Sequence, residues 1–143
     1  MGSRRAGREL ALQALYQLDM TESEDPRELG LFWSYFDRPA EVQAFAQELV
    51  DGTLRQRERI DKLIAESAEH WRLPRLSKVD LNLLRLATYE LLDRPEIPSS
   101  VTLNEAVEIA RRFGSDDSAS FVNGVLDHIA GVLGVKGRER PVE

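Results

Sequence analysis

Apolar residues recur at intervals of three and four along most of the chain, which is the period of helices that bury one face. No segment has a strand period of comparable length. The pattern therefore predicts an all-α fold of about seven helices in a single domain over residues 1–143. The expected helices are 3–20, 29–36, a third from Pro39 towards Gly52, 60–68, 77–92, 102–113 and 118–133.

The helix expected after Ser77 is apolar around most of its circumference, with Val79, Leu84 and Leu91 among its members. A helix of this kind lies at the centre of a protein, so it should form the spine of the C-terminal half. Ser77 with Asp80, and Thr102 with Glu105, each match the spacing of a capping box, in which a serine or threonine begins a helix.

The stretch RRFGSDDSASFVNGVLDHIA, residues 111–130, joins the last expected pair of helices. Gly114 is expected to end the first of them in the left-handed conformation. Asp116, Asp117 or Ser118 should cap the next helix. The Asn-Gly pair at 123–124 is a hairpin signal, but the helical period continues through it and predicts helix.

Composition describes an ordinary globular chain of 143 residues, 42% hydrophobic and 31% charged. The chain has no cysteine, which excludes disulfides, thiol catalysis and cysteine-based zinc sites. No apolar run approaches the ~18 residues of a membrane span and no signal peptide opens the chain, so we expect a cytoplasmic protein without a membrane segment.

The charge is unevenly distributed along the chain. The net charge is −6, yet Arg4, Arg5 and Arg8 all precede the first acid, Glu9. Arginines in the first turns of a helix oppose the helix dipole, a local conflict that suggests binding. A basic patch on an acidic body is compatible with RNA binding, and a merely solubilising terminus is the alternative interpretation.

Candidate catalytic chemistry is sparse. His70 and His128 lie far apart without metal-ligand spacing, and the segment GSDDS lacks the second glycine and the lysine of a phosphate-binding loop. The numerous carboxylates are explained by their placement on solvated helix faces. The sequence predicts a protein that is not an enzyme and that needs no cofactor or metal.

Three blocks of sequence resemble the NusB family of transcription antitermination factors. They are RRAGRELALQALYQLD near the N-terminus, VDLNLLRLATYELL in the centre, and FVNGVLD preceded by LNEAVEIARRFG. The resemblance runs from Arg4 to about Leu133 with the blocks in order. It implies one NusB-like domain built of two packed helical bundles, with residues 134–143 as a frayed tail.

The resemblance also implies a function and partners. It implies a non-enzymatic factor that, with the small-subunit ribosomal protein NusE, binds single-stranded boxA RNA and promotes processive transcription of ribosomal RNA operons. RNA polymerase would be engaged indirectly, through the antitermination complex. The sequence does not decide whether the free protein forms a homodimer. It also does not give the RNA sequence preference or the affinity.

The family motifs assign these roles to particular residues. Tyr16 and Asp80 match partner-binding positions, although Asp80 is equally explained as a helix-capping acid. Phe121 either stacks on a base or anchors its helix in the core, and Asn123 is either structural or a base reader. The RNA-binding set implied by the resemblance is Arg4, Arg5, Arg8, Asp117, Phe121 and Asn123.

Other functions remain compatible with these residues. Ribosomal RNA cytosine methyltransferases carry a NusB-like domain, so the chain could be a recruitment module of such a system. It could also be a helical adaptor that binds only protein, with arginines that serve solubility.

Overall fold

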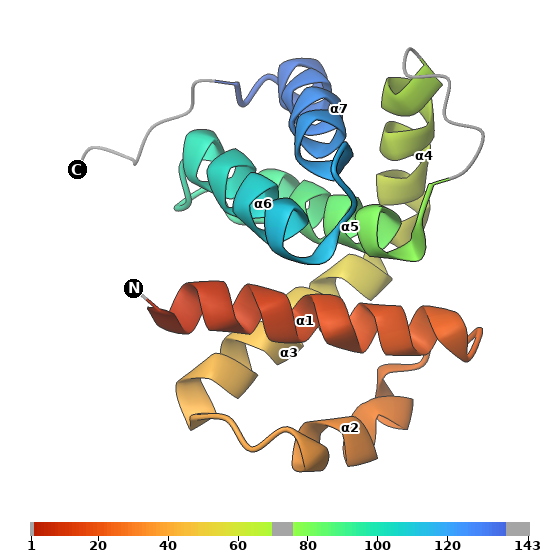
Figure 1. The fold of residues 1–143 in the computed structure, drawn as a ribbon, viewed down its shortest axis with the longest axis vertical. Coiled ribbons are helices and arrows are strands. Elements are labelled where there is room, and N and C mark those ends of the chain that lie inside the picture. Colours follow the sequence, from red (N-terminus) through yellow and green to blue (C-terminus); the bar gives the residue numbers. More distant parts are fainter. Residues whose placement is uncertain (1, 70–75, 137–143) are drawn as a thin grey trace.

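The computed structural model describes residues 2–69 and 76–136, and within these ranges every regular element is helical (Figure 1). The predicted all-α fold is confirmed. The elements are α1 Gly2–Met20, the short 3-10 helix η1 Pro26–Leu29, α2 Gly30–Tyr35, α3 Ala40–Arg55, α4 Arg57–Ala68, α5 Lys78–Asp93, α6 Ser99–Phe113 and α7 Ser118–Leu133. None of these helices is long and apolar enough to cross a membrane.

The helices form two groups, with α1, α2 and α3 in one and α4 to α7 in the other (Figure 1). Helix α5 contacts α1, α3, α4, α6 and α7, and its residues from Asn82 to Leu91 are all buried. A helix with apolar residues on nearly every side requires neighbours on every side. The predicted central position of this helix is confirmed.

Helix α1 supplies the largest contact between the two groups. Its predicted apolar stripe is buried and packs between α3 and α5. This stripe consists of Leu10, Ala11, Ala14, Leu15 and Leu18. Because the stripe covers only one side of α1, residues on its other side, such as Tyr16 and Gln17, are left at the surface.

Gly52 does not break its helix, since α3 continues to Arg55. A Cβ at this position would overlap the ring of Tyr89 on α5. The glycine therefore permits close approach of an aromatic side chain rather than ending an element.

Helix α6 begins at Ser99, after Pro98, and not at Thr102. Thr102 and Glu105 thus lie inside the helix and form no capping box. Ser77 does begin α5, its hydroxyl accepting a hydrogen bond from the backbone N–H of Asp80 at 3.0 Å. Helix α7 ends at Gly134, which has a φ of 74°, and residues 137–143 of the predicted tail lie outside the described residues.

Candidate nucleic-acid and partner-binding surfaces

Arg8 is part of the interior. Its side chain is 5% exposed and forms a two-point ion pair with Glu90 of α5, both N–O distances being 2.8 Å. The hydroxyl of Thr102 on α6 also contacts Glu90, at 3.4 Å. Both guanidinium donors that face Glu90 form hydrogen bonds with its carboxylate, so Arg8 joins α1 to the second group of helices. Its placement does not favour the phosphate contact expected from the sequence.

Arg5 and Arg4 lie progressively closer to solvent. Arg5 forms a two-point ion pair with Glu105 of α6, with an Nη2–Oε2 distance of 2.9 Å. The hydrogen bonds from Arg5 lower the pKa of Glu105, and the same bonds raise the pKa of Arg5. Arg4 is exposed, with its guanidinium 4.8 Å from the centre of the Phe45 ring. A cation stacked in this way keeps its charge and its outward donors.

Two further arginines, which the sequence analysis did not select, stand at the end of α6. The side chains of Arg111 and Arg112 are 61% and 67% exposed. Arg112 approaches Glu9 of α1 to 3.1 Å and Arg5 of α1 approaches Glu105, so these two arginines bridge α1 and α6, whereas Arg111 pairs with Glu108 of its own helix. Basic residues are common in the last turn of a helix because they interact favourably with the helix dipole. The sequence alone therefore does not mark Arg111 and Arg112 as binding residues. The arginine strip consists of Arg4, Arg5, Arg111 and Arg112.

The strip leads to the α6–α7 turn, residues 114–118. Gly114 has φ −98° and ψ −170°, so the predicted left-handed conformation is wrong. The glycine is needed because a Cβ would overlap the side chain of Ser118. Asp117 holds the N-cap position of α7 but forms no capping hydrogen bond through its side chain. Asp116 and Asp117 are both exposed and face solvent beside the strip.

Phe121 and Asn123 separate into two environments. Phe121 is 6% exposed and belongs to the hydrophobic core, which favours the packing role over base stacking. Asn123 is exposed and lines a hollow of about 510 Å³ between α6 and α7. The hollow has a mixed polar and apolar lining and is bordered by Asn104, Val107, Glu108, Arg111, Asp116, Ala119, Ser120 and Asn123.

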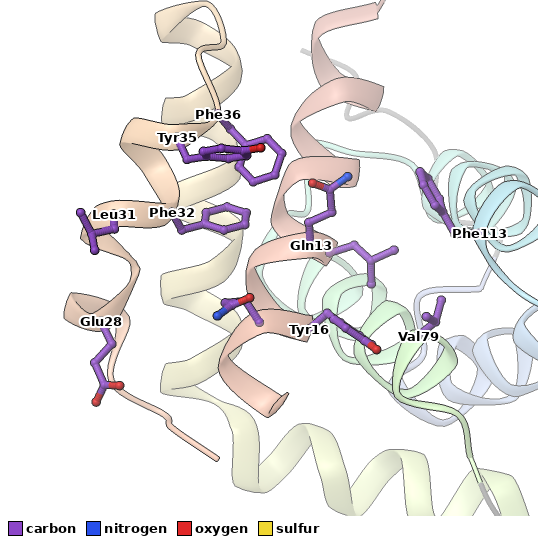
Figure 2. A pocket seen from close by; sticks show the side chains of 11 residues that line it. Gln13, Tyr16, Glu28, Leu31, Phe32, Tyr35, Phe36, Val79 and Phe113 are labelled. Atoms are coloured by element: carbon purple, nitrogen blue, oxygen red, sulfur yellow. The ribbon is translucent and has the colours of Figure 1, made fainter. Parts of the chain in front are cut away.

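Tyr16 lies in an apolar groove of about 720 Å³ that straddles α1 (Figure 2). On one side of Tyr16 stand the aromatic residues of α2, and on the other stand Val79 and Phe113. Leu31 and Tyr35 are 86% and 81% exposed, far more than apolar side chains of a closed core. The groove is lined by Leu12, Gln13, Tyr16, Gln17, Glu28, Leu31, Phe32, Tyr35, Phe36, Val79 and Phe113.

Asp80 lies next to this groove in sequence but is only 8% exposed. Its Oδ2 accepts a hydrogen bond from Ser118 Oγ at 3.0 Å, and its Oδ1 is buried without a hydrogen-bond partner in the described part of the chain. Of the two partner-binding positions expected from the sequence, the structure leaves Tyr16 at the surface and encloses Asp80.

The fold and these surfaces together define an all-α protein of two packed helical groups, with a cationic strip beside an apolar groove. The chain belongs to the NusB family, whose family profile matches residues 5–131. It is 49% identical to the transcription antitermination protein NusB of Geobacter sp. strain M21, over 93% of this chain and 97% of the relative. It is 47% identical to that of Myxococcus xanthus, over 93% and 98%.

Solved structures agree in fold. The chain superposes on NusB of T. maritima with a TM-score of 0.79 at 41% identity, covering 90% of each chain. It also superposes, with a TM-score of 0.77 at 27% identity, on a chain of a complex of antitermination factors NusB and NusE with double-stranded RNA. This match covers 92% of the present chain and 98% of the other.

Proposed function

We propose that this protein is an RNA-binding transcription antitermination factor that acts with NusE on single-stranded boxA RNA. The observation that carries the proposal is the continuity of two surfaces: the arginine strip reaches the α6–α7 turn, and Phe113 beside this turn lines the apolar groove. The names of the relatives support the same function.

A single strand suits the chemistry of the strip. Guanidinium groups bind phosphates in bidentate fashion, and a flexible strand can follow a curved surface that a rigid duplex cannot. Arg5, Arg111 and Arg112 each form an ion pair with a carboxylate, which limits nonspecific binding of polyanions. We propose that Arg4 and Arg112 contact phosphates, and that Asp117 and Asn123 stand where base edges pass.

The apolar groove is proposed as the docking surface for NusE. Its exposed aromatic and aliphatic side chains, with Tyr16 at the centre, have the composition of an interface core. Glu28 on its border is suited to a basic partner such as a ribosomal protein. Because the groove and the strip adjoin at Phe113, one RNA strand can touch both proteins, and the partner then strengthens RNA binding without any change in this chain.

The proposal includes a cytoplasmic, non-catalytic role. Among the described residues, Glu9, Glu105 and Glu108 beside the strip serve as ion-pair partners of arginines. Engagement of RNA polymerase is proposed to be indirect, through the assembled complex.

The test is fluorescence anisotropy of a labelled single-stranded boxA RNA titrated with the full chain, alone and with saturating NusE. We expect weak binding alone and tighter binding with NusE. Tyr16→Ala should reduce the gain from NusE, while Val132→Ala, which removes an exposed apolar side chain outside the groove, should not. Binding of NusE without any binding of RNA would support an adaptor and exclude the proposed function.

A further inference from the structure

Asp80 lies in the first turn of α5 but directs its carboxylate to another helix. In a reciprocal capping box, the acid would bond to the backbone of the capping residue. Here Ser77 caps the Asp80 N–H, whereas Asp80 Oδ2 accepts from Ser118 Oγ on α7 at 3.0 Å. The carboxylate is buried, and its Oδ1 has no hydrogen-bond partner among the residues that the structure describes. Buried polar atoms are usually hydrogen-bonded, so a buried carboxylate with only one bonded oxygen indicates a functional role.

Ser118 passes this contact on to the α6–α7 turn. Its Oγ accepts from the backbone N–H of Ser115 at 2.9 Å and lies 3.2 Å from Ser115 Oγ. A hydroxyl carries one hydrogen, and that of Ser118 is donated to Asp80, so the Ser115 hydroxyl must donate to Ser118. The hydrogen bonds therefore run in one direction, from Ser115 through Ser118 to Asp80.

Gly114 lies close against Ser118. Ser118 is 1% exposed, and a Cβ at Gly114 would overlap its Oγ and Cβ. The Gly114 N–H donates to the carbonyl of Ala110 at 2.8 Å, which fixes the glycine to the end of α6. Ser118 is thus confined between the turn backbone and Asp80, and moving either neighbour moves the turn.

We infer that Asp80 is a positioning residue of the RNA-binding surface, acting through Ser118 on the α6–α7 turn. This inference rests on the proposed function and gives Asp80 an interior role in place of a partner contact. The turn carries the exposed Asp116 and Asp117 and leads directly into the part of α7 that presents Asn123. When Asp80 holds Ser118, these side chains are fixed before RNA arrives, which lowers the entropy cost of binding.

The experiment compares three variants of the full chain. Ser118→Ala and Asp80→Ala break the contact, whereas Asp80→Asn keeps a side-chain carbonyl that can accept from Ser118. Ser100→Ala, which removes an exposed hydroxyl on α6, is the matched control. Each is measured for boxA RNA affinity by anisotropy, NusE affinity by titration calorimetry, thermal melting, and exchange of the Ser115 amide by NMR.

We expect Ser118→Ala and Asp80→Ala to weaken RNA binding about three- to tenfold, as for the loss of one hydrogen bond, with faster exchange of the Ser115 amide. Asp80→Asn should restore most of the affinity, and NusE affinity should stay within about twofold throughout, because no partner contact is removed. Ser100→Ala should match the wild type in all four measurements.

A lowered melting temperature with unchanged RNA affinity of the folded variants would overturn the inference, as would loss of NusE binding in Asp80→Asn. If the wild-type chain binds no RNA, the proposed function fails. The exchange rate of the Ser115 amide still tests the hydrogen bonds from Ser115 through Ser118 to Asp80. An unchanged rate in Asp80→Ala would disprove this coupling. Should Asp80→Ala not fold, Gly114→Ala displaces Ser118 by a direct clash and must show the same loss of RNA affinity.

Discussion

Arg8 of α1 and Glu90 of α5 form a buried ion pair in which both guanidinium donors lie 2.8 Å from the carboxylate oxygens. The pair connects the two groups of helices, with Thr102 of α6 as a third member. An arginine in an N-terminal basic cluster thereby serves the fold.

Removing one member of this pair is expected to be costly. Arg8→Ala leaves Glu90 buried without its counter-ion and should lower the free energy of unfolding by ~3–5 kcal/mol. Urea denaturation of the purified variant measures this loss. The double variant Arg8→Met, Glu90→Leu replaces the pair by apolar side chains and should recover much of the stability. A single variant as stable as the wild type would show that the pair does not hold the groups together.

Replacing the exposed arginines should affect RNA binding rather than stability, in contrast to replacing Arg8. Arg4→Ala and Arg112→Ala are expected to leave melting nearly unchanged and to weaken RNA binding. Each lost phosphate contact should lower the slope of log affinity against log salt by about 0.7. Titrations at several salt concentrations give this slope. Arg27→Ala, at an exposed arginine on η1 far from the strip in sequence, is the control and should keep the wild-type slope.

Phe121 is expected to affect stability more than binding. Phe121→Ala removes a core side chain and should lower the free energy of unfolding by ~3–5 kcal/mol. Thermal and urea melts check this value. If the variant instead melted like the wild type and lost ~1–3 kcal/mol of RNA binding, the residue would be a base-stacking platform.

Asp117 places a negative charge beside the proposed path of the RNA. Asp117→Asn removes this repulsion without removing a side-chain cap, because Asp117 forms none. We expect equal or tighter RNA binding, most clearly at low salt where charges are least screened. A loss of affinity at unchanged melting temperature would mean that the carboxylate itself accepts a hydrogen bond from the RNA.

The pair of Arg5 with Glu105 should make stability depend on pH in acid. Its hydrogen bonds lower the pKa of Glu105 from the usual value of 4.5 in the folded protein. The unfolded chain then binds this proton more readily, so the contribution is full above the ordinary pKa and is lost as pH falls through the lowered one. Glu105→Gln should show a shallower fall of melting temperature below about pH 4.5 than the wild type. Glu66→Gln, at an exposed acid on α4, is the control.

The sequence predicted the helices well because their apolar stripes are long and regular. The central place of α5 followed from apolar residues on all its sides, and residues 123–124 were correctly assigned to a helix. Thr102 and Glu105 misled because their spacing is the same at a helix start and inside a helix. Pro98, whose ring fixes φ near the helical value, lies next to the true start at Ser99.

The site was harder to predict, because its residues depend on partners that are distant in sequence. Nothing near Arg8 shows that it meets Glu90, and nothing near Asp80 shows that it meets Ser118. Arg111 and Arg112 were overlooked since a last helical turn commonly carries cations. The sequence suggests a left-handed backbone conformation as the reason for Gly114. The actual reason is its small size, because a Cβ at this position would overlap the side chain of Ser118.

The contact between Arg8 and Glu90 also has a consequence for synthesis on the ribosome. The residues are 82 positions apart, and at ~5–20 residues per second the acid is made about 4–16 s after the arginine. Within this interval, once α3 has been made, the nascent α1 can pack its apolar stripe against α3, but the guanidinium of Arg8 has no carboxylate from α5 to meet. Docking of the first three helices onto the remainder must therefore be a late event, completed only when α5 has left the exit tunnel.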